Sequence, residues 1–458
     1  MLTTRLIDRC FRRYLATLAV GASLPLAAIQ LSGCGDSSDA DAVATAEADA
    51  ASESQADAIA KAAAEGKTVV TPEQLVVAAD QLIKRQRYAD ANKVLTLAIK
   101  AKPSLPQAYV LRAAVFANAN LRTRAIADMT RAIQLDPENA AYLDQRGYYL
   151  LSDQNFGPAL ADFDAAIAAD DTYAKARNNR ALVNLQVGRH EEALADLDAA
   201  LTIDPEYVEA LNNRGYTKLK LERFDSALAD FDKAVEVDPK FVNAWSNRGM
   251  ARLQVNRVDD AIADFSHAIS LSPGSAALYE RRSGAYRRAG QDSAAEADLT
   301  EVKWLRTFAA LTQNLRRQPK KVAGYIARSR HLADHGRTAD AIADLDRALK
   351  VDPQSTEAML EKASRLTEAN QFDAARQLCD AALQISPLPE AYSLRGDVLY
   401  KAGDLDNAIA DYEQAQRMDS QVARAFFERG KQREQSGQIQ QASADFETAS
   451  QLDPSLTR

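Results

Sequence analysis

The chain has 458 residues, enough for two or three ordinary domains or for one long repeat array. Its 18 glycines and 14 prolines are fewer than turn-rich all-β folds need. The formal net charge of -8 argues against a nucleic-acid binder, because such proteins need a basic face. Three cysteines cannot form a disulfide framework, and 47% hydrophobic with 26% charged residues excludes a disordered or multispan membrane chain.

The segment 1–33 has the pattern of an export signal. A head with four arginines and one aspartate precedes an uncharged run over residues 14–33. The run ends in Leu31-Ser32-Gly33-Cys34, which resembles the lipobox of bacterial lipoproteins. The resemblance implies cleavage after Gly33 and a lipid on Cys34, and hence anchoring in a membrane. An uncleaved anchor is the alternative, although Pro25 and Gln30 make the run a poor spanning helix.

Residues 34–70 are expected to form a disordered tether. From residue 35 onward the segment holds thirteen alanines and eight acids, with four large aliphatic residues, too few to bury. A lipoprotein signal places the folded part on the periplasmic face of the cell envelope. Gly35 after the cysteine, in place of aspartate, weakly favours the outer membrane over the inner one, by resemblance to enterobacterial sorting.

The remaining chain is built from a repeating unit. Pro205, Pro239 and Pro273 are equally spaced and mark its period, and a small residue lies twelve positions before each such site. A small residue at a fixed position lets two helices approach closely. Eleven copies carry alanine there: Ala91, Ala125, Ala159, Ala193, Ala227, Ala261, Ala295, Ala341, Ala375, Ala408 and Ala442.

These copies resemble the tetratricopeptide repeat (TPR), a pair of antiparallel helices in each unit of about 34 residues. A typical copy reads Ala244-Trp245-Ser246-Asn247-Arg248-Gly249, followed by Ala261-Ile262-Ala263-Asp264-Phe265 and Pro273. The resemblance covers about 72–458. It implies an all-α fold, a right-handed α-solenoid of about eleven repeats, as in bacterial TPR-containing lipoproteins.

The array has one irregular step. The distance from Pro273 to Pro319 is longer than one repeat period, and the extra sequence has a helical pattern. We expect two stacks joined by an extended helix, with repeats one to seven in 71–307 and repeats eight to eleven in 308–458. The apolar side chains of the extra segment would pack the joint or form an exposed docking ridge: Trp304, Phe308, Leu311 and Leu315.

Nine repeats carry arginine on the first helix where a typical TPR has leucine. The same nine carry aspartate on the second helix, and the two repeats that lack one residue lack the other. This co-occurrence predicts a charge-assisted pair inside each hairpin, for example Arg214 with Asp230 and Arg248 with Asp264. A basic binding stripe is the less favoured alternative.

The first helices are expected to line a concave groove that binds an extended or helical peptide. The groove residues are Gln145, Asn178, Asn179, Asn212, Asn213 and Asn247, with Tyr148, Tyr216 and Met250 adding apolar contacts. A row of amides can hydrogen-bond a peptide backbone without reading its side chains. The row is similar to the asparagine ladder of the O-GlcNAc transferase superhelix, whose catalytic domain has no counterpart here.

No arrangement of residues predicts catalysis, a metal site, a cofactor or a small-molecule substrate. The sequence therefore predicts a lipid-anchored, non-enzymatic scaffold or adaptor that binds a protein or peptide client. One alternative is a self-assembling structural protein of the envelope. Another is a relative of a TPR-linked glycosyltransferase that lacks the catalytic domain.

Overall fold

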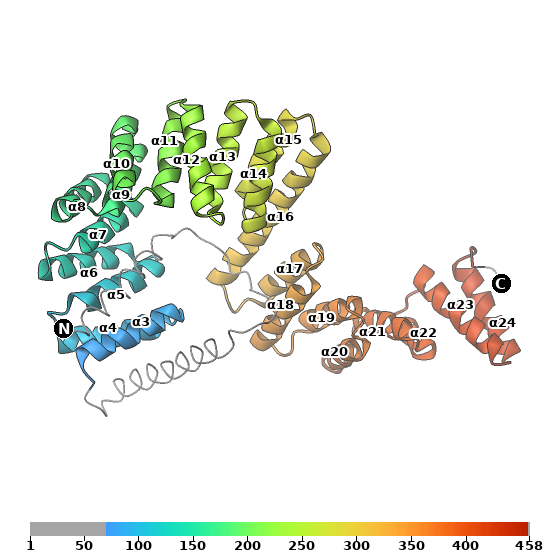
Figure 1. The fold of residues 1–458 in the computed structure, drawn as a ribbon. Coiled ribbons are helices and arrows are strands. Elements are labelled where there is room, and N and C mark those ends of the chain that lie inside the picture. Colours follow the sequence, from blue (N-terminus) through green and yellow to red (C-terminus); the bar gives the residue numbers. More distant parts are fainter. Residues whose placement is uncertain (1–69, 457–458) are drawn as a thin grey trace, which may run out of the picture. The chain divides into compact units, whose positions relative to one another are not determined.

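The computed structural model describes residues 70–456, which hold 22 helices and no strand. The predicted signal peptide, Cys34 and the acidic segment up to residue 69 lie outside the described residues. The predicted lipid on Cys34 therefore stays a prediction. The all-α repeat architecture is confirmed: the helices pair in sequence as antiparallel hairpins, here called repeats 1 to 11, each made of an A helix and a B helix (Figure 1).

Two compact units divide the described chain between Glu296 and Ala297. The first unit holds repeats 1 to 6, the A helix of repeat 7 and the start of its B helix. Its helices are α3 (Pro72–Lys84), α4 (Tyr88–Ala101), α5 (Pro106–Asn118), α6 (Arg122–Leu135), α7 (Ala140–Ser152), α8 (Phe156–Ala169), α9 (Ala174–Gln186), α10 (His190–Ile203), α11 (Val208–Lys220), α12 (Phe224–Val237), α13 (Val242–Gln254), α14 (Val258–Leu271), α15 (Ala276–Arg288) and the first turn of α16 (Asp292–Arg317).

The second unit begins inside α16 and continues through repeats 8 to 11. Its further helices are α17 (Val322–Ala333), α18 (Thr338–Val351), α19 (Thr356–Glu368), α20 (Phe372–Ile385), α21 (Pro389–Ala402), α22 (Leu405–Gln414), α23 (Ser420–Gln435) and α24 (Ile439–Leu452). The predicted extended helix is present, since α16 runs unbroken for 26 residues.

A left-handed residue ends the A helix in every repeat. A positive φ angle turns the chain back within three residues, so that the B helix starts antiparallel to the A helix. Glycine adopts this conformation without strain, whereas other residues lose about 1–2 kcal/mol. The eleven residues are Gln86, Asn120, Gln154, Gly188, Glu222, Asn256, Gly290, Gly336, Asn370, Gly403 and Gly437.

Each hairpin is closed by small residues. The eleven repeated alanines of the B helices are all at most 2% exposed, which lets the A and B helices approach closely. Facing them, Gly147, Gly215 and Gly249 of the A helices lie under an aromatic ring of their own B helix. A Cβ atom on Gly249 would lie 2.8 Å from Cε1 of Phe265, closer than carbon atoms can pack.

The A helices form the inner side of the first unit. Cα atoms of α7 and α9, α9 and α11, α11 and α13, and α13 and α15 approach within 8 Å, although a B helix separates each pair along the chain. Consecutive B helices of the described chain make no comparable approach. Because the A helices are closer together than the B helices, the stack curves around them, and their outward-facing residues line the concave surface.

The C-terminal half of α16 packs on α17 within the second unit. Leu315 is 6% exposed and contacts Gly324, while Trp304, Phe308 and Leu311 are half-buried. The Trp304 ring stacks on His335 with ring centres 4.0 Å apart, and its Nε1 donates to the carbonyl oxygen of His331. Trp304, Phe308 and Leu315 thus have partners inside the second unit, since the Phe308 ring stacks on Trp304 with ring centres 5.5 Å apart.

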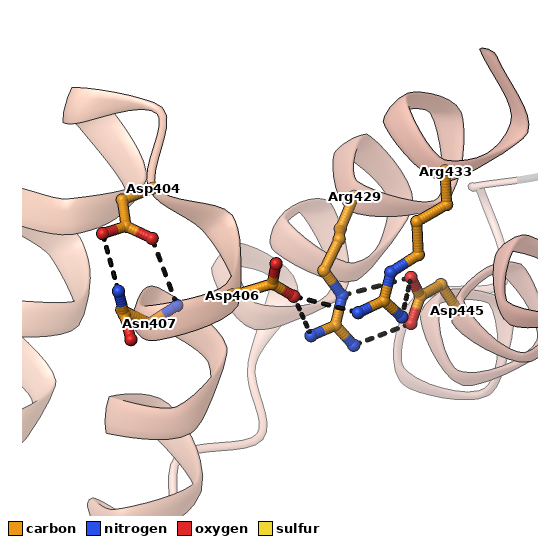
Figure 2. Close-up of polar contacts among 6 residues, drawn as sticks. All are labelled: Asp404, Asp406, Asn407, Arg429, Arg433 and Asp445. Carbon is orange, nitrogen blue, oxygen red and sulfur yellow. Dashed lines mark hydrogen bonds and ion pairs between the residues drawn. The ribbon is translucent and has the colours of Figure 1, made fainter. Parts of the chain in front are cut away.

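Repeat 11 contacts repeat 10 near the start of the short helix α22. Helix α22 has only ten residues and ends before a left-handed residue at Gln416. Arg429 and Arg433 of α23 both reach Asp406, near the start of α22, with N–O distances of 3.0 and 2.9 Å, and both also bind Asp445 of α24 (Figure 2).

Asp404 caps the N-terminus of α22. Asp404 accepts hydrogen bonds from the backbone and side-chain nitrogens of Asn407 (Figure 2).

On α24, Ser443 is exposed and Ser450 half-buried at sites where Leu228 and Val235 of repeat 5 are buried. A polar outer face of this kind is what a terminal repeat needs.

Candidate client-binding groove

The predicted arginine–aspartate contacts are present as two-pronged hydrogen bonds within single hairpins. Arg214 donates to the carboxylate of Asp230 through Nε and Nη2, at 3.0 and 2.6 Å, and Asp230 is 4% exposed. Arg248 holds Asp264 in the same way, at 3.1 and 2.7 Å. A planar guanidinium matches a carboxylate in this geometry, which fixes the A helix against the B helix. The same contact joins 112 to 128, 146 to 162, 180 to 196, 328 to 344, 395 to 411 and 429 to 445.

Each of these arginines has a second contact that sequence reasoning missed. Nη1 of Arg214 donates to Asp198 on the B helix of the preceding repeat at 2.8 Å, and Arg248 reaches Asp232 in the same way at 2.7 Å. In repeats with threonine or serine at this site, the hydroxyl accepts instead. The arginine therefore joins three helices from two repeats. The sequence feature that indicates this contact is a hydroxyl or carboxylate side chain sixteen residues before most of these arginines.

Repeat 9 separates the two contacts. It carries Lys362 in place of arginine and Leu378 in place of aspartate, so the contact within the hairpin is lost. Lys362 still reaches Asp346 of the preceding repeat, with an Nζ–Oδ1 distance of 2.7 Å. The contact between repeats is thus kept where the contact inside the hairpin is absent.

The predicted groove amides form a hydrogen-bonded row across repeats. Asn213 Nδ2 donates to Asn178 Oδ1 at 2.8 Å, and Asn247 Nδ2 donates to Asn212 Oδ1 at 2.9 Å. Both bonds join one A helix to the preceding A helix. Within a repeat, Asn212 donates to Asn213 at 3.4 Å, which links successive bonds. We call the five asparagines joined in this way the amide row: Asn178, Asn179, Asn212, Asn213 and Asn247.

The amide row has a charged residue at each end. At the start, Asn179 Nδ2 donates at 2.7 Å to Asp144, whose carboxylate is fully buried and lies 3.2 Å from Lys175 Nζ. At the other end, Arg281 of α15 donates to Ser246 of α13. Gln145, expected as the first member of the row, is buried on α7 and makes none of its bonds between repeats.

These bonds change how the asparagines can act. An asparagine side chain offers two N–H donors and a carbonyl oxygen with two lone pairs. In Asn178 and Asn212 the oxygen accepts from the next repeat and the nitrogen donates to a neighbour, and both residues are at most 6% exposed. Asn213 and Asn247 are half-buried and keep one N–H not used in the row. The row holds the A helices together and leaves these two as the amides that can meet a client.

A double apolar row runs beside the amides. Tyr148, Tyr216 and Met250 are half-buried, one helical turn from the amide row and on the same helix face. Leu182 occupies the same site in repeat 4. Sequence reasoning missed the second line of this surface, which lies three residues further along each A helix and is also half-buried: Leu151, Leu185, Leu219 and Leu253.

The second unit lacks such a surface on its first A helices. Arg330 of α17 pairs with Glu357 and Glu361 of α19 at 3.1 and 2.8 Å, and Arg365 pairs with Glu361 at 3.1 Å. The residues of these ion pairs occupy A-helix positions that carry amides and apolar side chains in the first unit. The groove of repeats 3 to 7 is therefore the candidate site.

The described residues offer no metal-binding cluster. Residues 70–456 contain no group of three or more metal-ligating side chains. Cys379 is fully buried in its hairpin, and burial raises the pKa of its thiol to about 12, which makes it a poor nucleophile. None of the helices in this part of the chain has the length and apolar character to cross a bilayer.

Family models of the tetratricopeptide repeat match most of the folded part. One matches residues 76–140, 212–276, 247–302 and 326–388, and two others match residues 185–222 and 389–421. The chain belongs to the TPR family. Repeats of this family are modules for protein–protein interaction, so the coarse function of the chain is that of an interaction scaffold. No curated protein matches it.

Several solved TPR structures are similar to this TPR protein in part. A TPR protein from Parabacteroides merdae is 22% identical, with a TM-score of 0.37, and the match covers 57% of this chain and 98% of that one. PilF of Pseudomonas aeruginosa is 18% identical, with a TM-score of 0.40, and the match covers 44% and 93% of the two chains. PilW, a type IV pilus biogenesis factor, is 20% identical, with a TM-score of 0.42 and coverage of 46% and 96%.

Proposed function

We propose that this TPR protein is a non-enzymatic adaptor of the cell envelope, anchored by a lipid on Cys34, that holds a client polypeptide in the groove of repeats 3 to 7. The observation that carries the proposal is the double apolar row next to half-exposed amides on the inner side of the first unit. An extended peptide can bury apolar side chains against the row and hydrogen-bond through its backbone to Asn213 and Asn247.

The anchor adds to binding by confining the groove. A client at the same membrane face meets a tethered groove at a raised effective concentration, without any additional contact. The placement on the periplasmic face rests on the lipobox-like end of the signal, and Gly35 after the cysteine weakly favours the outer membrane over the inner one. Mass spectrometry of the N-terminal peptide tests it: a lipid-modified Cys34 is expected, and an intact residue 1 would contradict it.

A crosslinking pull-down from membranes tests the groove. The main variant is Tyr216→Ser with Met250→Ser, because these side chains are half-buried and are not members of the amide row. Partners captured by the native chain should be lost from this variant. Val187→Ser, an exposed apolar residue outside the groove, is the matched control and should keep them. Identical partner lists for all three chains would contradict the proposal.

The triple variant Asn179→Ala, Asn213→Ala and Asn247→Ala is a less specific test. All three side chains bond the preceding repeat, so their removal weakens the stack as well as any client contact. Loss of partners from this variant counts only if its melting curve stays within a few degrees of the native one.

Self-assembly is the competing function. The polar Ser443 and Ser450 argue against stacking at the C-terminal end, whereas Val77 of α3 is 48% exposed at the other end. Light scattering over a hundredfold range of concentration separates the two. A constant monomer mass supports the adaptor, and a mass that grows with concentration supports assembly.

A further inference from the structure

The connections that lead from each B helix to the next A helix all lie on one edge of a stack. In every hairpin the B helix runs antiparallel to the A helix, so it ends at the level where the A helices begin. We call this side the B-to-A edge. In the second unit it consists of the following connections, with the helix ends that flank them: 318–321, 352–355, 386–388 and 415–419.

The first of these connections carries a concentrated positive charge. The segment 302–333 holds eight lysines and arginines and no acid, although the whole chain has a net charge of -8. Four of these bases lie where α16 leads into α17, are all exposed, and pair with no carboxylate of residues 70–456: Arg316, Arg317, Lys320 and Lys321. We call these four the basic loop. Their charge is available to an anionic partner.

The same edge of the first unit has the opposite charge. Its connections hold two lysines against seven acids: Asp136, Glu138, Asp170, Asp171, Asp204, Glu206 and Asp238. Asp204, for example, accepts the backbone N–H of Glu206 at 3.1 Å and so closes its turn. At the site of Asp204 the connection from α16 to α17 has Gln318. The positive charge is therefore a property of the second unit and not of the repeat.

Exposed aliphatic side chains lie on the same edge of the second unit. Ile385 ends α20, Leu388 lies directly before α21, and Met418 lies two residues before α23. They are 44%, 40% and 66% exposed. The acids of these connections, Asp352 and Asp419, accept hydrogen bonds from backbone N–H groups of their own turns. The edge thus combines unpaired cations with exposed apolar side chains.

We propose that the B-to-A edge of the second unit docks on the surface of an anionic lipid bilayer, with the basic loop on the phosphate groups and Ile385, Leu388 and Met418 among the headgroups. This inference rests on the lipid anchor of the proposed function and adds a second contact with the same membrane. Clusters of lysine and arginine near a membrane anchor bind anionic headgroups. With a lipid on Cys34, the folded part stays within the reach of residues 34–70, so the edge meets the bilayer at a raised effective concentration.

The distribution of these side chains favours a bilayer over a protein partner. The basic loop, Ile385 with Leu388, and Met418 belong to three different connections. A bilayer surface accepts scattered side chains one by one, whereas a protein interface is packed around a continuous apolar centre. Lysine and arginine beside exposed aliphatic residues are also the composition of segments that lie in the membrane interface.

The test places a fluorescent label that responds to apolar surroundings on the full, lipid-anchored chain. Ile385→Cys carries the label, and Ile203→Cys, at the end of α10 in the first unit and 38% exposed, is the matched control site. The native cysteines do not interfere, since Cys379 is buried and Cys34 would carry the lipid. The vesicles are phosphatidylcholine alone, or phosphatidylcholine and phosphatidylglycerol in equal parts. We expect the label at 385 to shift to the blue only with phosphatidylglycerol, and the label at 203 to emit alike in both.

Two sets of substitutions separate the basic loop from the net charge. Replacing all four bases of the loop by glutamine should abolish the shift. Replacing four equally exposed bases of the first unit by glutamine should leave it in place: Lys93, Lys100, Arg122 and Arg131. Melting curves within a few degrees of the native one show that both variants are folded.

The aliphatic side chains have a test of their own. Leu388→Ser with Met418→Ser, on the chain labelled at 385, should reduce the shift without abolishing it, because the basic loop still holds the edge at the headgroups. An unchanged shift would show that the apolar side chains take no part, which would overturn that half of the proposal.

Three results would overturn the proposal as a whole. One is a shift of equal size in both kinds of vesicle, and another is a shift that survives the loss of the basic loop. The third is an emission that differs, without any vesicles, between the native chain and the variant that lacks the loop. That difference would mean that the chain's own acidic segment 36–65 occupies the loop in place of a bilayer.

Failure of the anchor can be told apart from failure of the edge. Flotation with phosphatidylcholine vesicles requires the lipid on Cys34 and not the basic loop. If the chain does not float with them, the anchor of the proposed function is contradicted. The edge is then judged by added phosphatidylglycerol vesicles alone: a blue shift at 385 supports it, and an unchanged emission overturns it.

Discussion

A Cβ atom on Gly215 would lie 2.7 Å from Cε1 of Phe231. The same relationship holds in every repeat with an aromatic residue at that site of the B helix: glycine faces Phe163, Phe231, Phe265, Tyr412 and Phe446. Repeats with a smaller B-helix residue have alanine or serine instead, as in Ala181 with Leu197. The two positions share one fixed volume, because the helix axes cannot move apart without breaking the stack.

Gly215→Ala should therefore destabilise the protein by about 1–3 kcal/mol, the usual cost of overpacking. Phe231→Leu alone should also cost about 1 kcal/mol or more through the cavity it leaves. The double variant recreates the arrangement of Ala181 with Leu197 and should be more stable than the sum of the two changes by at least about 1 kcal/mol. Urea denaturation measures all three, and simple additivity would contradict the shared volume.

The two acids bound by Arg214 should differ in their effect on stability. Asp230 is buried, so Asp230→Ala leaves a cation without its main partner and should cost about 3 kcal/mol. The double variant Asp230→Ala with Arg214→Ala should be only slightly less stable than Asp230→Ala alone. The side chain of Asp198 is 62% exposed, and Asp198→Ala should stay within about 0.5 kcal/mol. Equal effects of the two aspartate changes would be incompatible with this geometry.

The amide row should contribute to stability in the absence of any client. Asn212→Ala removes the acceptor of Asn247 and should destabilise the chain by about 1–2 kcal/mol, since a partly buried hydrogen bond is lost and its donor is left without this partner. Asn243→Ala, an exposed asparagine on α13, is the control and should be neutral. If Asn212→Ala leaves the free energy of unfolding unchanged, water replaces the lost hydrogen bond at no cost and the prediction is wrong.

The left-handed turns predict opposite effects for two substitutions. Gly188 has a φ of 78° with open space around it, so Gly188→Ala introduces backbone strain alone and should cost about 1 kcal/mol. Glu222 has a φ of 58° in the corresponding turn, and Glu222→Gly should be neutral or stabilising by up to about 1 kcal/mol. Thermal melts compare the two, and a reversed order would refute the assignment.

Cys379 should be chemically inert in the folded protein. With its pKa raised to about 12, against about 8.5 for a free thiol, its thiolate fraction at pH 8 falls roughly a thousandfold. Mass spectrometry after iodoacetamide treatment should find Cys379 modified only in urea. Modification at equal rates in buffer and urea would show that this hairpin opens freely.

The repeat and its helical hairpin could be predicted from the amino-acid sequence alone. The regular period of the alanines and prolines defines where each helix pair begins and ends, because every copy has to present the same small residues to the same neighbour. The presence of Arg214 with Asp230, and the absence of both partners in repeats 1 and 9, were visible for the same reason. Both residues belong to one repeat, so their contact is local in sequence.

The contacts between repeats, in contrast, became visible only in the folded chain. The second contact of Arg214, the bonds from Asn213 to Asn178 and from Arg281 to Ser246, and the packing of α16 on α17 all join residues that different repeats bring together. Their geometry depends on how far each hairpin is rotated on the last, which the period does not specify. For this reason the sequence predicted a row of asparagines as a client surface, whereas the structure places every asparagine of that row in a hydrogen bond between A helices.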